Sequence, residues 1–479
     1  MSLYLMPFSL LVKHYFTDFN GQLAELPIYL MISCVIIYLI QGNKVYFHSI
    51  IRIKSVICLF VFLTLQLVAV LISYAEIGNS IYNVKPFIGY MNFIKFLMPI
   101  ILIYFLVRTL VNKRRDIHMF LFGSFISTII ILFVTYTQLL SSLMPQSSLL
   151  NNLTSFYGYL FEARNLDVPE WYVMGSYVQT LGRVNGFFSE SGMLAAYLSI
   201  VCLPFIMSAI KNKNDIFLRK KYNPLMYYSL FLLIIGILLL AKTSTGLVAI
   251  LVIFLLMLKS MPPKRKITVG LLIVCILGFI IILYYKNQHV SQLINYYTFE
   301  RSDSSSNDNR IGGTLGLIIS IMHRPFLGTG FSYLNYYLNE YIPDWSRNNF
   351  EFYQFTTIRH SFPIMSNLFG WMCQFGTIVV IGFIIYILRL SKEIKLLIKI
   401  INNPSEYFYF QTIYDAMSLS VLLFFILSLL GFVWSEPGYL ILFFFFVSFR
   451  QYLKRQYNSQ NISKASVQKS TNGLNRVAQ

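Results

Sequence analysis

Long apolar runs separated by short polar segments dominate the chain. A helix that crosses a bilayer needs about 17 to 25 mostly apolar residues, and runs of this length begin near the following positions: Leu26, Ser55, Phe87, Ile117, Glu190, Pro224, Ser244, Ile267, Pro363, Ile413 and Tyr439. Residues 1–12 are also apolar, but they are too few for a full crossing and predict a surface helix or a partial span. The pattern therefore predicts an all-α polytopic membrane protein with about 11–12 transmembrane helices.

Two longer segments interrupt the series of helices, at about residues 139–189 and 286–362. Strict alternation places both on the outward-facing side, and loops of this length usually carry function. Ile311, Leu315 and Ile318 recur at helical spacing after a polar run, which indicates a short amphipathic helix on the outer leaflet. We expect residues 1–456 to form a single transmembrane domain and residues 457–479, rich in Ser, Asn, Gln and Lys, to form a disordered cytoplasmic tail.

Composition and charge agree with this topology. Hydrophobic residues make up 56% of the chain and charged residues 12%, too little charge for a water-soluble surface. The chain has 38 Lys and Arg against 19 Asp and Glu, a formal net charge of +19. When the loop containing Lys44, Arg52 and Lys54 is placed in the cytoplasm, the positive excess falls on the cytoplasmic side, as the positive-inside rule requires. The charge therefore gives no reason to expect a nucleic-acid partner.

The sequence offers no metal or cofactor motif. The cysteines all lie in apolar runs and read as packing residues: Cys34, Cys58, Cys202, Cys275 and Cys373. There is no C-x-x-C, no H-E-x-x-H and no D-x-D in the outward loops, so we expect no metal. The absence of G-x-x-x-x-G-K-[ST] excludes nucleotide-driven transport of the P-loop type.

The first candidate site is the segment from Arg183 into the helix that begins near Glu190. Ser189 or Ser191 is the expected N-cap. Free N–H groups at an outward-facing helix start, next to an arginine, favour an anion site. The alternative is that Arg183 anchors lipid headgroups while the negative charge of Glu190 interacts favourably with the helix dipole.

The second and third candidate sites lie in the other outward loop. Arg310 is expected in the first turn of the amphipathic helix, where a cation opposes the helix dipole, so a phosphate-binding role is the better explanation. Arg324 ends the same stretch. Arg359 and His360 precede the next span, and a histidine at the interface can exchange protons near neutral pH. A purely structural role for this histidine is the alternative.

Aromatic residues are frequent in both outward loops. Rings with a polar tip can serve as platforms for sugars, although an interfacial aromatic belt explains most of them equally well. The residues in question are Tyr157, Tyr159, Phe161, Trp171, Tyr172, Tyr177, Tyr296, Tyr297, Tyr333, Tyr336, Tyr337, Trp345 and Tyr353.

Together, the three candidate stretches resemble the polysaccharide polymerase and ligase superfamily of bacterial envelopes, that is, O-antigen polymerases and O-antigen ligases. The first stretch matches the family pattern at Arg183, Gly186, Phe188 and Glu190. The second matches an arginine that precedes a P-x-x-G-x-G turn, at Arg310, Pro325, Gly328 and Gly330. The third matches at His360, Gln374 and Gly376, but Ser361 stands where Asn often follows the histidine and Gln374 stands where Glu is usual.

The resemblance implies a membrane glycosyltransferase of the cytoplasmic (inner) membrane, with its site facing the periplasm or exterior. Its donor would be an undecaprenyl-pyrophosphate-linked oligosaccharide, and no cofactor would be needed. Arg183, Arg310, Arg324 and Arg359 would bind the pyrophosphate, and His360 or Glu190 would act as the base. The expected reaction is transfer of a growing polysaccharide onto the next lipid-linked repeat unit, with a separate protein controlling chain length.

Three alternatives remain open at this point. The first is an O-antigen ligase, which hands the finished glycan to lipid A-core or a protein. The second is a lipid-linked glycan flippase or secondary transporter, for which repeat symmetry and mid-membrane charges are expected. The third is a non-catalytic assembly subunit.

Overall fold

Helices make up most of the part of the chain that the structure describes. The computed structural model describes residues 26–42, 53–165, 168–260 and 305–477, together with residues 262, 285, 286 and 291, and no strand occurs in these ranges. Five helices there are long and apolar enough to cross a membrane: Ile53–Ile77, Pro86–Leu110, Arg114–Leu143, Ser191–Asn212 and Pro404–Leu427. The prediction of an all-α polytopic membrane protein is confirmed. The predicted run from Ile267 and the N-terminal stretch 1–12 lie outside the described residues.

The other predicted runs each contain a helix. The first part of the chain forms α2 (Leu26–Ile40), α4 (Ile53–Ile77), α5 (Pro86–Leu110) and α6 (Arg114–Leu143). The middle forms α9 (Ser191–Tyr197), α10 (Leu203–Asn212), α11 (Pro224–Leu240) and α12 (Ser244–Ser260). The last part forms α18 (Asn367–Phe375), α19 (Thr377–Lys399), α20 (Pro404–Leu427) and α21 (Pro437–Val477).

Two of the predicted spans are not simple helices. A π-helical turn, η5 (Leu198–Cys202), joins α9 to α10, and Pro204 follows it. The run predicted from Pro363 divides into α18 and α19 at Gly376, whose φ is 86°. A Cβ atom at Gly376 would lie 2.1 Å from the carbonyl oxygen of Phe326. A close approach to a distant backbone segment therefore causes this break, and the local pattern of apolar residues gives no sign of it.

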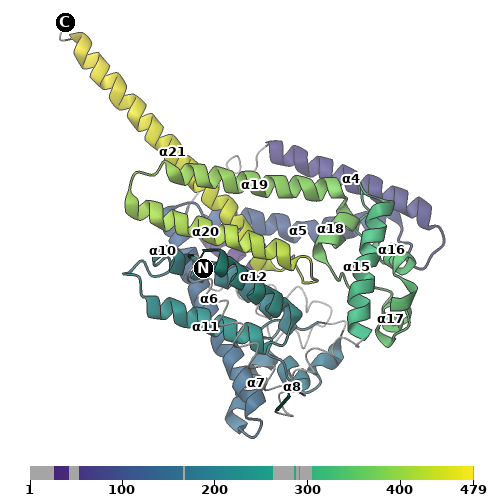
Figure 1. Ribbon diagram of the computed structural model, residues 1–479. Coiled ribbons are helices and arrows are strands. Elements are labelled where there is room, and N and C mark those ends of the chain that lie inside the picture. The colour runs from purple at the N-terminus through teal and green to yellow at the C-terminus, as the bar shows by residue number, and fades with distance from the viewer. Residues whose placement is uncertain are drawn as a thin grey trace.

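Helix packing builds the body of the protein around α5, α6, α10, α20 and α21 (Figure 1). α10 packs against α20 and α11, and α19 packs against both α20 and α21. α2 and α4 each pack against α5. Aromatic side chains fill the contacts, as where the rings of Phe120 and Phe445 stack 4.0 Å apart between α6 and α21.

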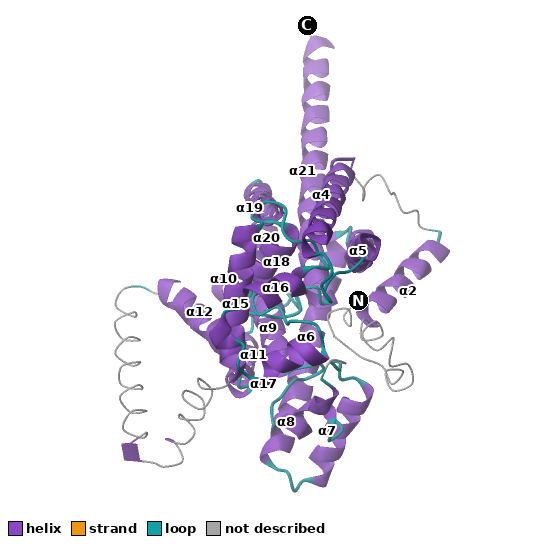
Figure 2. Ribbon diagram, turned by 90° about the vertical axis from the view of Figure 1, so that its right-hand side faces the viewer, coloured by secondary structure: helices purple, strands orange, loops and turns teal. Residues whose placement is uncertain are grey.

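Short helices fill both of the long segments that were predicted to face outward, here called the first and second outward loops. The first contains α7 (Ser148–Leu160), η4 (Pro169–Tyr172) and α8 (Tyr177–Leu181). The described part of the second contains α15 (Ser305–His323), α16 (Leu334–Tyr341), η6 (Asp344–Ser346), α17 (Phe350–Tyr353) and η7 (Gln354–Ile358). Figure 2 shows α7 and α8 together at one end of the molecule.

The predicted amphipathic helix exists as α15, but it packs more closely than a surface helix would. A Cβ atom at Gly312 would lie 2.0 Å from Ser346 Oγ, and one at Gly316 would lie 3.0 Å from the side chain of Ile342. These glycines let α15 approach the segment after α16, so α15 is held by protein contacts.

The last helix continues far beyond the bundle. α21 runs to Val477 and extends away from the other helices as it nears the C-terminus (Figures 1 and 2). It thus passes through the segment 457–479, for which the composition predicts disorder. The division of the chain into one domain and a tail stays a prediction.

Candidate functional site

Two polar side chains fix the turn that follows Arg183. Gln138 on α6 accepts hydrogen bonds through Oε1 from the backbone N–H groups of Asn185 (3.2 Å) and Gly186 (2.8 Å), and its Nε2 donates to the Gly186 carbonyl (2.9 Å). Glu162 Oε1 accepts from Asn185 Nδ2 (2.6 Å) and from the Tyr177 N–H (3.1 Å). Gln138, Glu162 and Asn185 are fully buried. The path of the chain from Arg183 into α9 is therefore set by interior hydrogen bonds.

Gly186 is required at this turn. Its φ is 60°, and a Cβ atom there would lie 3.1 Å from Thr135 Oγ1. Only glycine adopts this left-handed conformation without strain. The glycine of the first candidate stretch thus has a structural reason to be there, independent of any ligand.

Glu190 forms the start of α9. It occupies the N-cap position with extended backbone, whereas Ser189 and Ser191 were the expected caps. That expectation is wrong: Ser191 is the first helical residue, and the Ser189 hydroxyl lies 3.1 Å from Met193 Sδ. Burial raises the pKa of the Glu190 carboxyl, and the positive charges of Arg310 and Arg183 partly offset this effect.

Arg310 comes to this place from the other outward loop. It lies in the second turn of α15, one turn later than predicted because the helix already begins at Ser305. Its Nη1 donates a hydrogen bond of 3.2 Å to the hydroxyl of Ser244, the first residue of α12. α12 in turn packs against α9. The structure therefore brings Arg183, Glu190 and Arg310 together where α9 and α12 both begin.

A further cation lies on the short connection that leads into α12. Lys242 is exposed and has a φ of 54°, a left-handed conformation that is uncommon for residues other than glycine. It stands two positions before Ser244, the partner of Arg310. Sequence reasoning missed Lys242, Ser244, Gln138 and Glu162. Gln138 was identifiable from the sequence, because a polar residue within an apolar run indicates a structural or functional role.

The buried side chains of Tyr172 and Tyr177 lie beneath the backbone that leads into α9. The Tyr172 hydroxyl donates to the Ser189 carbonyl (2.7 Å) and accepts from the Asn165 N–H (2.9 Å). The Tyr172 and Tyr177 rings lie 6.2 Å apart. Burial raises the pKa of both hydroxyls. Because both side chains are buried, they position the Ser189–Glu190 backbone and are not available as open platforms for sugars.

Arg324 lies at the other end of α15, about 21 Å along the helix from Arg310. It forms an ion pair with Glu76 at the end of α4, and its guanidinium carbon lies 5.8 Å from the Tyr337 ring centroid. His323 Nε2 lies 2.7 Å from Glu76 Oε1, and the Tyr337 hydroxyl donates to Glu76 Oε2 at 3.0 Å. Arg324 thus anchors α15 to α4. Its predicted ligand-binding role stays a prediction.

Arg359 and His360 lie where the two outward loops meet. Arg359 Nη2 lies 3.6 Å from Glu170 Oε1 of the first loop. His360 is exposed, its Nδ1 lies 2.6 Å from the Thr356 carbonyl oxygen, and its ring centroid lies 6.5 Å from that of Tyr82. Its φ of 47° marks a strained backbone. Among the described residues, His360 contacts Thr356 and Tyr82 and not Glu190, the other candidate base.

The glycines of the second and third stretches pack against each other. The Thr329 N–H donates to the Cys373 carbonyl (2.7 Å), and the Gly330 N–H donates to the Gln374 carbonyl (3.1 Å). Gly328 has a φ of 73°, and a Cβ atom there would lie 2.6 Å from the Cys373 oxygen. The P-x-x-G-x-G turn and Gln374–Gly376 therefore form one backbone contact, which accounts for these glycines without a ligand.

The cluster of Arg183, Glu190 and Arg310 is suited to binding an anion. Two guanidinium groups and two adjacent helix starts favour phosphate or carboxylate oxygens. Within the described ranges, no group of three or more His, Cys, Asp and Glu side chains is placed to hold a metal. The arrangement can bind and orient an anionic group through side-chain and backbone donors.

Comparison with known proteins matches one part of the chain. The family model described as 7 transmembrane receptor (Secretin family) matches residues 80–200, about a quarter of the chain. The matched part includes α5, α6 and the segment that carries Arg183 and Glu190. No curated protein and no solved structure matches the chain.

This match contradicts the predicted resemblance to O-antigen polymerases and ligases, because it points to a different family of membrane proteins. The predicted polymerase function and the classification as a glycosyltransferase of lipopolysaccharide biosynthesis are therefore wrong, and the flippase alternative has no better support. The structure gives a physical reason for the misleading motifs. Gly186, Gly328, Gly330 and Gly376 are needed for backbone geometry, so their spacing carries little information about chemistry.

Proposed function

We propose that this multi-pass membrane protein recognises a phosphate-bearing amphiphile through Arg183 and Arg310. The ligand class is a lipid with an anionic headgroup of one or two phosphates, the class to which an undecaprenyl-pyrophosphate-linked oligosaccharide belongs. The protein binds and orients this ligand. A separate regulatory protein was expected only from the family resemblance and stays a prediction.

The single observation that carries the proposal is the combined electrostatic effect of two arginines on Glu190. Arg183 and Arg310 belong to two different outward loops, and both act electrostatically on the same half-buried carboxyl group. One carboxylate balances one guanidinium, so the cluster keeps a net positive charge. An incoming phosphate would supply the missing negative charge, and guanidinium groups match its oxygens in geometry.

The surroundings favour an amphiphile over a free anion. α9 continues through η5 and α10 as one of the helices that can cross a membrane, Ser191–Asn212, so the cluster lies at the end of an apolar span. A lipid could place its headgroup at the arginines and its chain along such helices. The match of residues 80–200 to a receptor family also supports ligand recognition as the role of this region.

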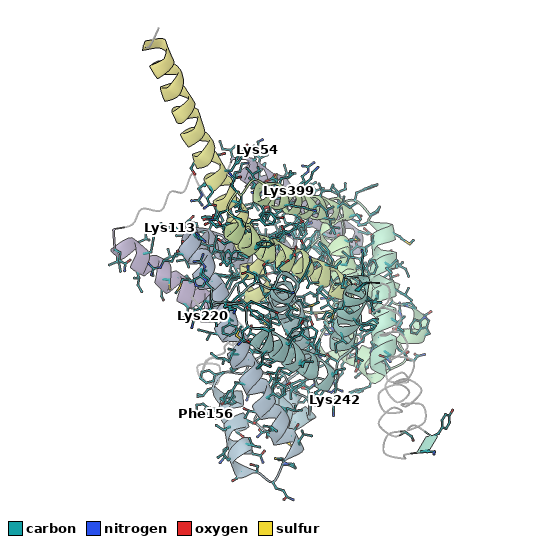
Figure 3. The ribbon with its side chains drawn as sticks, turned by 60° about the vertical axis from the view of Figure 1, so that its left-hand side comes forward. Lys54, Lys113, Phe156, Lys220, Lys242 and Lys399 are labelled. Carbon is teal, nitrogen blue, oxygen red and sulfur yellow. The ribbon has the colours of Figure 1, made fainter. Side chains whose placement is uncertain are left out.

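The charge distribution supports an outward-facing site in the cytoplasmic membrane. Lys54 and Lys399 lie in segments assigned to the cytoplasm by the positive-inside rule, whereas Lys242 and Phe156 lie in outward segments. Figure 3 shows the labels of Lys54 and Lys399 toward one end of the molecule and those of Phe156 and Lys242 toward the other.

Binding of farnesyl diphosphate to the purified full-length protein in detergent tests the proposal. Each of Arg183→Ala and Arg310→Ala removes charge-assisted hydrogen bonds worth about 1.5 to 3 kcal/mol, so the affinity should fall about tenfold or more. Farnesol, which lacks phosphate, should bind weakly to all variants. Lys85→Gln is the matched control, because Lys85 is an exposed cation at the start of α5 on the same predicted side. Equal affinities of Arg310→Ala and Lys85→Gln would refute the proposal.

A further inference from the structure

A second basic cluster lies on the side assigned to the cytoplasm. It combines the start of α6, where Lys113, Arg114 and Arg115 are exposed, with the loop between α10 and α11, where Arg219 and Lys220 are exposed. Figure 3 shows Lys113 and Lys220 on the same side of the molecule. The site proposed above uses none of these residues.

Asp215 shapes the loop that presents Arg219. The buried Asp215 carboxylate accepts hydrogen bonds from the N–H groups of Phe217 (3.1 Å), Leu218 (3.0 Å) and Lys220 (3.2 Å). It also accepts one from the Tyr227 hydroxyl at 2.7 Å. Arg219 lies inside this turn with a φ of 55°. These hydrogen bonds hold the loop that carries Arg219 in place.

Arg219 lies over the ring of Tyr409 of α20, and Arg114 lies beside the same helix at Glu406. The guanidinium carbon of Arg219 lies 5.1 Å from the centroid of the Tyr409 ring. Arg114 and Arg219 both interact electrostatically with Tyr409 and with Tyr452 of α21. Arg114 also forms an ion pair with Glu406, one turn before Tyr409. Two cations, from the start of α6 and from the loop, thus act on Tyr409, where Glu406 pairs with Arg114 and the Asp215 carboxylate also contributes to the local field.

The Tyr409 hydroxyl lacks a partner in the described structure. Tyr409 is only 5% exposed, and its hydroxyl oxygen makes no hydrogen bond with any described residue. Buried hydroxyl groups are normally satisfied. An unsatisfied hydroxyl donor on a ring that the Arg219 guanidinium covers points to an acceptor that carries negative charge.

We propose that Arg114, Arg219 and Tyr409 bind the phosphate of an anionic phospholipid. Arg219 and Arg114 would contact its oxygens, and the Tyr409 hydroxyl would donate a hydrogen bond to it. A lipid is favoured over free phosphate because apolar side chains next to the cluster are exposed: Met119 of α6 is 43% exposed and Phe408 of α20 is 53% exposed. Both helices are long and apolar enough to cross a membrane, so acyl chains can follow them from the headgroup.

Lipid binding to the purified full-length protein, measured by native mass spectrometry, tests this assignment with phosphatidylglycerol as the probe. Tyr409→Phe and Arg219→Gln should each lower the affinity about tenfold, while phosphatidylcholine should bind weakly to every variant. Lys399→Gln, which removes an exposed cation at the end of α19, should leave phosphatidylglycerol binding unchanged. Unchanged binding by Tyr409→Phe, or equal losses in Arg219→Gln and Lys399→Gln, would overturn the proposal.

Thermal unfolding supplies a second readout that does not depend on the abundance of bound lipid. Without anionic lipid, Tyr409→Phe should unfold at the same or a higher temperature than the wild type, because it removes an unsatisfied buried hydroxyl. Added phosphatidylglycerol should stabilise the wild type more than this variant. Equal stabilisation of the two proteins would contradict the assignment, as would stabilisation of the wild type by inorganic phosphate alone to the same extent.

Discussion

Arg310 donates a hydrogen bond of 3.2 Å to the hydroxyl of Ser244, a residue 66 positions earlier in the chain. The bond joins α15 of the second outward loop to the first residue of α12. A guanidinium group held at one nitrogen keeps its other donors directed, so this bond orients Arg310 at the proposed ligand site.

Ser244→Ala should therefore weaken ligand binding without changing the charge of the site. The loss of one such hydrogen bond corresponds to about 1 kcal/mol, or roughly a fivefold loss of affinity for farnesyl diphosphate. Ser244→Thr keeps a hydroxyl and should retain most of the affinity. If the alanine variant binds as tightly as the wild type, Ser244 does not orient Arg310.

Glu190 should make anion binding depend on pH. Burial raises the pKa of its carboxyl above the usual value, so the native state favours the protonated form more than the unfolded state does. The corresponding contribution to stability is present at low pH and is lost as the pH rises through the raised pKa. A bound phosphate would raise this pKa further, because two negative charges repel each other.

The affinity of the wild type for farnesyl diphosphate, relative to that of Glu190→Gln, should accordingly increase as the pH falls from 7 toward 5, because the titration of the diphosphate is common to both proteins. Glu190→Gln should bind more tightly than the wild type at pH 7, and this difference should shrink toward pH 5, where the wild-type carboxyl becomes protonated. Isothermal titration at several pH values measures both effects. An identical pH profile in the variant would show that Glu190 is not coupled to the ligand.

The buried Glu162 side chain should contribute to the stability of the folded protein. Glu162→Ala removes the buried acceptor of the Tyr177 N–H and one of the two acceptors of the Asn185 side-chain amide, which keeps its hydrogen bond to the Phe188 carbonyl. The expected loss is about 3 kcal/mol in the free energy of unfolding, which lowers the temperature of thermal unfolding. Glu170→Gln alters a side chain that is 57% exposed and should change stability little. Similar unfolding temperatures for both variants would argue against a supporting role of Glu162.

Gly376 and Gly382 form a matched pair on either side of the start of α19. Gly376→Ala places a Cβ atom 2.1 Å from the Phe326 carbonyl oxygen at a φ of 86°, so we expect a severe loss of folded protein. Gly382 lies inside α19, and a Cβ atom added there would meet no atom of the described residues within 4 Å. Gly382→Ala should be neutral or stabilise the protein by up to about 1 kcal/mol. The yield of monodisperse protein on size-exclusion chromatography compares the two.

The sequence predicts most of the helices because a bilayer imposes a simple length rule on apolar runs. It does not predict the break at Gly376, which depends on a backbone segment about fifty positions away, or the π-helical turn within the span from Ser191. Arg183 and Arg310 were identifiable as unusual cations in segments predicted to face outward. Their common partner Glu190 and the supporting side chains of Gln138 and Glu162 depend on tertiary contacts. The family and the reaction inferred from short motifs were wrong, because several of the residues in those motifs serve backbone geometry.

The π-helical turn Leu198–Cys202 lets one membrane span contact two different sets of helices. Such a turn inserts one residue into the helix and rotates everything after it by about 100° relative to an uninterrupted α-helix. α9 faces α12 before the insertion, and α10 faces α20 and α11 after it. Deleting one residue between positions 198 and 202 would swing one of these two surfaces away from its partner. A single extra amino acid thus sets the relative orientation of the end of this span at Glu190 and its opposite end.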